Sequence, residues 1–178
     1  AKAISRRGFA VDAQTVLVTS GAEHAIAATL TALCDPGDTV MVEQYTWSGT
    51  RALASLLRLG LKPIAMDAEG MMPDAFDAAC RATGARVLYT TPEIQNPTAS
   101  VLGEERRRQI AEIARRHDVT VIEDDIYGTL PKNPTAPIAV FAPERTVYIT
   151  GASKTMAPAL RVGMAAVPRD RIGRFSSA

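Results

Sequence analysis

The sequence predicts a three-layer αβα domain, in which a mostly parallel sheet of about seven strands lies between two layers of helices. Short apolar runs, rich in β-branched residues, alternate with longer segments of helical periodicity along the whole chain. This alternation is typical of βαβ units, whose helices cover both faces of a parallel sheet. With 178 residues, of which 47% are hydrophobic and 22% charged, the chain has the size and composition of one globular domain.

The first part of the chain contains three predicted strand and helix pairs. The strands are residues 15–20, 39–43 and 62–67. The helix after the first strand ends at the turn Asp35-Pro36-Gly37-Asp38, and Gly60 is the predicted cap of the second helix. Pro63 predicts an edge position for the third strand, because proline cannot donate to a ladder. Pro73 begins the third helix.

The second part of the chain continues the pattern. The predicted strands are residues 86–91, 119–123, 146–150 and 163–167, and residues 104–117 form a long amphipathic helix. The proline-rich stretch 130–143 predicts a loop with a short helical turn. Because 163–167 follows 146–150 so closely, we expect it to be antiparallel. Residues 171–178 have the pattern of a helix in progress, so we expect a fragment of a longer polypeptide.

Composition excludes several classes of function. No apolar run approaches the roughly 20 residues that span a bilayer, and residues 1–7 lack the apolar stretch of a signal peptide, so we expect no membrane contact and a cytoplasmic location. A net charge of +1 argues against nucleic-acid binding by this segment alone. Arg106, Arg107 and Arg108 are interpreted, with Arg115 and Arg116, as the solvated face of one helix. The two cysteines, Cys34 and Cys80, indicate neither a metal site nor a disulfide framework.

The most distinctive segment follows the strand 146–150. The small residues Gly151 and Ala152 let the chain turn, and Lys154 then lies at the end of a buried strand. There an ammonium loses part of its hydration, which favours the free amine that attacks a carbonyl. Arg161 offers the donor fork that suits a phosphate. A lysine for an aldehyde and an arginine for a phosphate suggest pyridoxal 5′-phosphate (PLP), although a surface lysine with an unrelated arginine is the alternative.

Other polar residues follow the remaining strands, where ligands of parallel sheets bind. Ser20-Gly21-Ala22 begins a helix, whose N-terminus favours a phosphate, although many helices begin in this way. In the same helix Glu23 is left unassigned and His24 receives no catalytic role.

The later strand ends add three more kinds of side chain. Trp47 could stack on a pyridine ring, with core packing as the alternative. Asn96 lies in an Asn-Pro turn and offers an amide donor. Asp124 could face a pyridine nitrogen and keep it protonated, with Tyr127 three residues further on, or the acids could simply cap a turn.

At these residues the sequence resembles a known family. Residues 153–163, Ser-Lys-Thr-Met-Ala-Pro-Ala-Leu-Arg-Val-Gly, are similar to the lysine segment of class I/II (fold type I) aminotransferases. Within it, the motif Pro-Ala-Leu-Arg most resembles the aminotransferase-like domains of MocR-type regulators in the GntR family. The order of the strand-end residues extends the resemblance over nearly the whole chain. Two departures are Ala99 and Ala159, where the family usually has glycine.

The resemblance implies a role for each residue. Lys154 would hold PLP as a Schiff base and would be catalytic together with Asp124 and Tyr127. The remaining cofactor-binding residues would be Ser20, Gly21, Ala22, Ser153 and Arg161 at the phosphate, Trp47 on the ring face and Asn96, with Tyr127, at the phenolic oxygen.

The implied activity is transfer of an amino group between an amino acid and a 2-oxo acid by a homodimer. The alternative is an effector-sensing domain of a GntR/MocR-type regulator, which would contact DNA only through a domain outside this chain. A protein that has the fold without the cofactor is disfavoured, because Lys154, Asp124, Tyr127 and Arg161 are all present. Residues 1–178 would form the PLP-binding large domain, without the N-terminal arm or domain and the C-terminal small domain. We expect this segment alone to bind PLP weakly and to turn over little.

Overall fold

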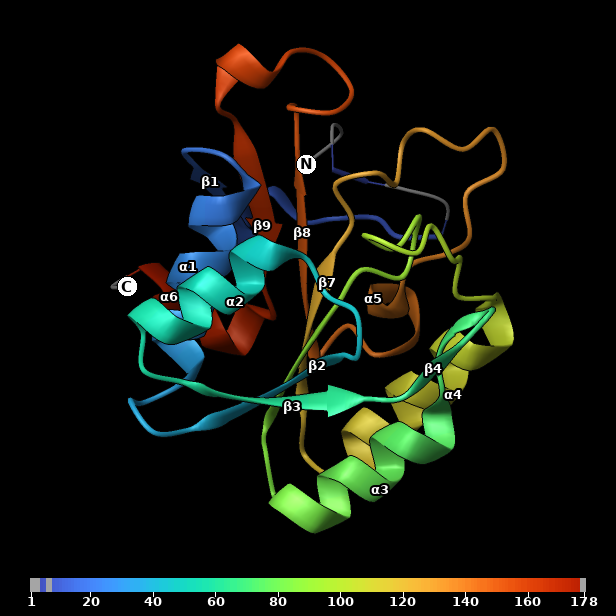
Figure 1. The fold of residues 1–178 in the computed structure, drawn as a ribbon. Coiled ribbons are helices and arrows are strands. Elements are labelled where there is room, and N and C mark those ends of the chain that lie inside the picture. Colours follow the sequence, from blue (N-terminus) through green and yellow to red (C-terminus); the bar gives the residue numbers. More distant parts are fainter. Residues whose placement is uncertain (1–3, 6–7, 177–178) are drawn as a thin grey trace.

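A computed structural model describes residues 4–5 and 8–176 of the chain. Its centre is a seven-stranded sheet with the order β1-β9-β8-β7-β6-β2-β3 (Figure 1). The strands are β1 (Val16–Thr19), β2 (Thr39–Glu43), β3 (Gly60–Ile64), β6 (Val87–Thr90), β7 (Thr120–Asp124), β8 (Thr146–Gly151) and β9 (Gly163–Ala166). The predicted three-layer fold class is confirmed.

One strand runs against the others. β9 pairs antiparallel with β8 on one side and with β1 on the other, whereas the pairs among β8, β7, β6, β2 and β3 are parallel. The short connection between β8 and β9 explains this direction, since a parallel crossover needs a longer segment. β3 lies at an edge of the sheet, as Pro63 predicts.

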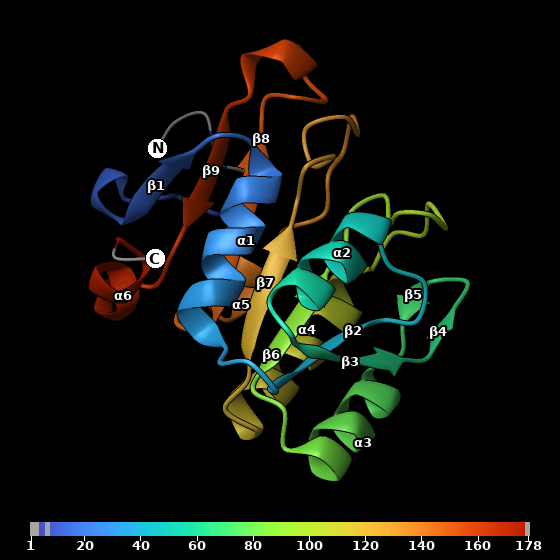
Figure 2. The ribbon, with the colours of Figure 1, turned by 60° about the vertical axis from the view of Figure 1, so that its left-hand side comes forward.

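Helices cover both faces of the sheet. On one face lie α1 (Ala22–Leu33), α2 (Ser48–Leu56) and α6 (Ile172–Ser176); on the other lie α3 (Pro73–Thr83), α4 (Glu104–Arg116) and α5 (Ile138–Phe141). Figure 2 shows α1 and α2 in front of the sheet and α4 and α5 behind it. Residues 177–178, the end of the helix predicted over 171–178, lie outside the described residues.

Each face has its own apolar core. Along β7, Val121 packs on the α3 and α4 side and Ile122 on the α1 and α2 side. A third, smaller cluster joins Ile4 to Tyr148 and Ala166. The alternation follows from the strand geometry, in which successive side chains point to opposite faces.

Two details of the connections differ from the sequence-based expectation. Gly60 does not cap α2: Arg58 makes the turn with a φ of 58°, and the amide of Gly60 donates to the carbonyl of Asp38 as the first residue of β3. A small hairpin of β4 (Met66–Asp67) and β5 (Gly70–Met71) also lies where no second sheet was expected.

The interpretation of Arg107 as a solvated residue is wrong. Its side chain is 0% exposed, whereas Arg108, the next residue of α4, is 52% exposed. In the described part of the chain, no helix is both long enough and apolar enough to cross a membrane.

Candidate functional site

A cavity of about 140 Å³ lies beyond the carboxyl ends of the central strands. In Figure 2 this is the upper end of the sheet, toward which the arrow of β7 points. Most of the predicted site residues line it: Ala22, Trp47, Asn96, Asp124, Tyr127, Ser153 and Arg161. They come from five different strand ends, as expected for a ligand site of a parallel sheet.

The other predicted residues adjoin the cavity without lining it. The carbonyl of Ser20 accepts a hydrogen bond from Nη2 of Arg161 at 3.5 Å, and a Cβ on Gly21 would lie 2.8 Å from the same nitrogen. The Nζ of Lys154 lies 6.0 Å from the centre of the Tyr127 ring. Lys154 itself is exposed, so the expected loss of hydration at the strand end is not seen. The reason is that β8 ends at Gly151 and the loop carries the lysine away from the sheet.

Asp124 is the buried acid of the cavity. Its side chain accepts hydrogen bonds from the hydroxyl of Tyr89 at 2.8 Å and from the amide of Ile126 at 3.3 Å. Burial raises the pKa of Asp124 to about 6, and the two hydrogen bonds oppose this shift. The acid therefore changes charge closer to neutral pH than an exposed aspartate does.

Arg161 lies beside the first turn of α1. It has left-handed backbone dihedrals, with φ 46° and ψ 42°, and its guanidinium approaches Gly21, where φ is 90°. A Cβ on Gly163 would lie 2.3 Å from the carbonyl carbon of Gly21, so only glycine allows β9 to approach this turn. A guanidinium is thereby placed at the N-terminus of a twelve-residue helix, where both favour an anion.

His24 and Glu23 have different positions in α1. The Nδ1 of His24 accepts a hydrogen bond from the amide of Ser20 at 3.2 Å, so this histidine stabilises the turn. Glu23, to which the sequence assigns no role, lines the cavity.

Trp47 is held by the first turn of α2. A Cβ on Gly49 would lie between 2.1 and 2.5 Å from three atoms of its indole ring. The ring therefore lies directly over Gly49, and any larger residue there would displace it.

The loop that carries Asn96 is fixed by Gln95. The Gln95 amide donates to the carboxylate of Glu43 at 3.0 Å and to the carbonyl of Tyr45, while its oxygen accepts from the amide of Thr98 at 2.9 Å. Within this loop Ala99 has a φ of 59°, a conformation that glycine adopts without strain. By contrast, Ala159 is not among the residues with positive φ, so its departure from the family pattern costs no backbone strain.

Glu43 and Tyr89 are site residues that the sequence analysis missed. Glu43, 1% exposed, accepts from Thr90 at 2.8 Å and from the amide of Thr91 at 3.2 Å, and burial raises its pKa. Tyr89 is 0% exposed and lines the cavity. An acid at the end of the buried run 39–43 was a signal for Glu43, whereas Tyr89 within an apolar strand gave none.

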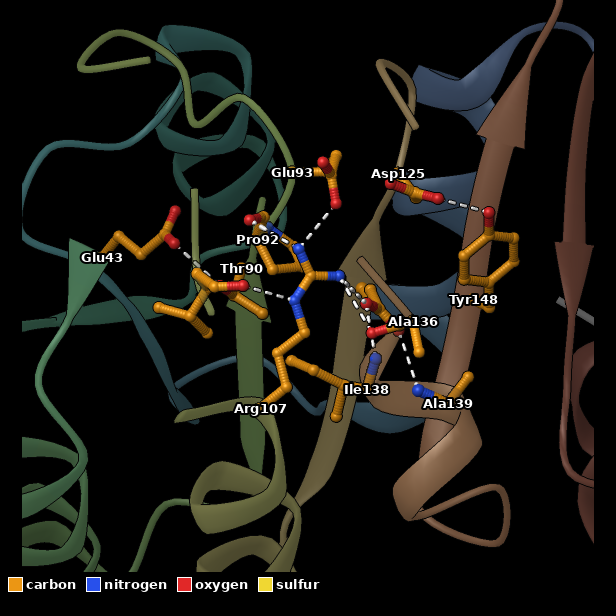
Figure 3. A network of polar contacts seen from close by, with 12 residues as sticks. Glu43, Thr90, Pro92, Glu93, Arg107, Asp125, Ala136, Ile138, Ala139 and Tyr148 are labelled. Atoms are coloured by element: carbon orange, nitrogen blue, oxygen red, sulfur yellow. Dashed lines mark hydrogen bonds and ion pairs between the residues drawn. The ribbon is translucent and has the colours of Figure 1, made fainter. Parts of the chain in front are cut away.

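Arg107 supports the same loop from the other face of the sheet. Figure 3 shows its guanidinium between Glu93 and the segment of Ala136. It donates to the Glu93 carboxylate at 2.7 Å and to the carbonyls of Leu102 and Pro92 at 2.7 and 3.0 Å.

The three consecutive acids at the end of β7 point in different directions. Glu123 accepts from the amides of Ile138 and Ala139, at 2.8 and 3.0 Å, and so caps α5. Asp124 faces the cavity, and Asp125 accepts from the hydroxyl of Tyr148 (Figure 3).

Fold and cavity together define a class of protein. A parallel sheet covered by helices, with an arginine at a helix N-terminus and a buried acid beyond its strand ends, is an arrangement typical of α/β domains that bind a small phosphorylated ligand. The chain belongs to the family Aminotransferase class I and II, whose model matches residues 1–175. The resemblance seen in the sequence is thus confirmed.

Relatives of both expected kinds are found. YdeF, an uncharacterized HTH-type transcriptional regulator of Bacillus subtilis, is 40% identical over 169 residues, which are 95% of this chain and 37% of YdeF. The aminotransferase swnA of Metarhizium robertsii is 33% identical, over 90% of this chain and 35% of swnA. This chain therefore spans about a third of the length of these relatives.

A solved structure has the same fold. The crystal structure of Pyrococcus horikoshii kynurenine aminotransferase, in complex with PMP, matches with a TM-score of 0.83 and 27% identity. The match covers 91% of this chain and 42% of that one. The family and the PMP complex indicate pyridoxal phosphate as the cofactor of this fold.

Proposed function

We propose that residues 1–178 form the PLP-binding large domain of an aminotransferase, which transfers an amino group between an amino acid and a 2-oxo acid. The observation that carries the proposal is the single cavity that holds Asp124, Asn96, Tyr127 and Arg161 together. Because these residues come from three separate segments, which follow β6, β7 and β8, their meeting in one cavity is not a consequence of local sequence.

The residues present fit the cofactor. Arg161 and the turn at Gly21 offer cationic and amide donors for a phosphate. Gly163 packs against this turn so closely that a side chain at position 163 would clash with the backbone of Gly21. Asp124 is a buried acid with a raised pKa, a group suited to a ring nitrogen that carries a proton. Bound PLP supplies an aldehyde and an electron-withdrawing ring.

Each residue of the proposed site then has a role. Arg161 and Ser153 bind the phosphate, and Asp124 holds the proton of the ring nitrogen. Trp47 covers the ring and excludes water, while Asn96 and Tyr127 donate to the phenolic oxygen. Lys154 binds the cofactor through its amine and moves a proton at the α-carbon of the substrate.

The test is the absorbance spectrum of the protein with added PLP. A new band that is lost in Lys154→Ala and retained in Lys132→Ala would support the proposal. Lys132 is the matched control because it is another exposed loop lysine. Borohydride reduction followed by peptide mapping should locate the label on Lys154. An unchanged spectrum, or equal labelling of both lysines, would remove the assignment.

A second function is favoured by one observation, the 40% identity with an HTH-type regulator. In that reading the PLP site senses an effector, and DNA is contacted by a domain outside this chain. The two readings differ in the full-length protein. Steady turnover of an amino acid and a 2-oxo acid supports the enzyme, whereas PLP-dependent DNA binding without turnover supports the regulator.

The assembly and location are also part of the proposal. We expect a homodimer in the cytoplasm. Light scattering of the full-length protein after size exclusion would test the dimer, and a monomeric mass would contradict it.

A further inference from the structure

Tyr89 is a buried tyrosine whose hydroxyl reaches the acid of the cavity. β6 and β7 are parallel, with Tyr89 opposite Ile122, so Asp124 lies two residues further along on the same face of the sheet. The Tyr89 side chain extends along this face, and its hydroxyl donates to Oδ2 of Asp124 at 2.8 Å. The amide of Ile126 donates to Oδ1 at 3.3 Å. One donor on each oxygen fixes the plane of the carboxylate.

The surroundings make Tyr89 a permanent donor. Its ring is part of the apolar core with Ile122 and Ile149, and it is 0% exposed. Burial raises the pKa of Tyr89 well above 10, so the hydroxyl keeps its proton. A neutral O–H next to a carboxylate stabilises the charged form of that carboxylate.

We propose that Tyr89 is a positioning residue for Asp124, which holds the carboxylate in one orientation at the base of the cavity and keeps it charged. The hydrogen bond itself is independent of any ligand. Its use, to aim the charge at a protonated ring nitrogen, rests on the proposed function.

Other charged groups lie near the same carboxylate. Glu43, on β2, is close enough for the charge of Asp124 to contribute to the raised pKa of Glu43. Glu23 of α1 and Arg161 of the loop between β8 and β9 line the same cavity, and Lys154 lies next to Tyr127 at its margin. A test must therefore compare variants in which all these groups are retained.

The decisive measurement is a carboxyl ¹³C NMR titration of Asp124 in the protein without PLP, with the resonance identified by its loss in Asp124→Asn. We expect a midpoint near 6 in the unmodified protein. Tyr89→Phe keeps the ring and removes the donor, and should raise the midpoint by about one to two pH units, since a hydrogen bond to a charged group is lost. An unchanged or lower midpoint would overturn the proposal.

Tyr148→Phe is the matched control. Tyr148 is another buried strand tyrosine, and its hydroxyl donates to Asp125, the neighbour of Asp124 on the other face of the sheet. This variant should leave the midpoint of Asp124 in place. An equal shift in both variants would mean a general loss of packing and would refute the specific role.

A second measurement does not depend on the folding of Tyr89→Phe. With ¹³Cζ-labelled tyrosine, the four tyrosines of the chain can be assigned by elimination from the Phe variants at 45, 127 and 148. The Tyr89 resonance should then move with the same midpoint as Asp124, and independence of the two titrations would overturn the proposal.

Measuring PLP binding separates this inference from the proposed function. Tyr89→Phe should weaken PLP binding by about tenfold, which corresponds to one pKa unit of Asp124. If the unmodified protein does not bind PLP, the proposed function fails, and the titration still decides the role of Tyr89. If PLP binds equally to Tyr89→Phe and the unmodified protein, the positioning role is refuted.

Discussion

Replacing Arg107 by methionine should destabilise the domain more than any other arginine change on α4. The side chain is 0% exposed and donates to the Glu93 carboxylate and to the carbonyls of Leu102 and Pro92, with Glu123 at 3.9 Å from Nη1. Methionine fills a similar volume but removes the positive charge beside two buried carboxylates. Breaking a buried ion pair from one side costs about 3–5 kcal/mol, a large part of the roughly 5–15 kcal/mol that stabilises a typical domain.

Arg108 is the matched control for this change. It is the next residue of α4 and pairs with Glu104 in solvent, with its guanidinium 4.4 Å from the centre of the Phe141 ring. An exposed pair and an exposed cation–π contact contribute about 1 kcal/mol or less each, so Arg108→Met should have a small effect. Arg107→Lys should fall between the two, because it keeps the charge and loses the planar fork.

The assay is urea unfolding followed by far-ultraviolet circular dichroism, which gives the free energy of unfolding for each variant. Because Pro92 and Glu93 lead into the Asn96 loop, Arg107→Met should also weaken PLP binding. If it costs no more stability than Arg108→Met, the reasoning about the buried network is wrong.

Three further changes are expected to have distinct results. Burial raises the pKa of Asp124 from 3.8 to about 6, so the stability that its proton contributes is present below about pH 4 and is lost as the pH rises through 6. The loss amounts to about 3 kcal/mol in the free energy of unfolding. Asp124→Asn should not show this loss in urea unfolding measured without PLP across the same pH range. Gly49→Ala should displace the indole of Trp47 and change the fluorescence of this single tryptophan, while the melting temperature changes little because alanine favours the helix. Ala99→Gly should raise the free energy of unfolding by about 1 kcal/mol, since it relieves a left-handed backbone, and a loss of stability would contradict that reading.

The sequence was sufficient for the sheet and for the line of polar residues beyond it. Apolar runs such as Val16–Thr19 are short and separated by helical periods, so the strands and their parallel direction follow from local pattern. Because parallel strands end at one edge, the sequence alone predicts that residues as distant as Trp47 and Asp124 lie near one another, and both line the cavity.

The buried polar network could not be predicted in the same way. Tyr89 and Asp124 are 35 residues apart, and nothing in an apolar strand indicates which polar partner a tyrosine will meet. Arg107 lies among three arginines, and only the packing of α4 on the sheet decides which of them is buried. Lys154 was expected at the sheet itself, but the length of the loop after Gly151 carries it outward.

The register of β7 decides which of the three acids at its end, Glu123, Asp124 or Asp125, faces the cavity. Glu123 caps a helix and Asp125 binds a core tyrosine on one face of the sheet, whereas Asp124 lines the cavity on the other, because successive side chains alternate between faces. Deleting one residue from the turn before Thr120 would shift the register of β7 by one residue, so that a neighbouring acid would face the cavity in place of Asp124. A homologue with an altered length at this turn should therefore lose its function before it loses its fold.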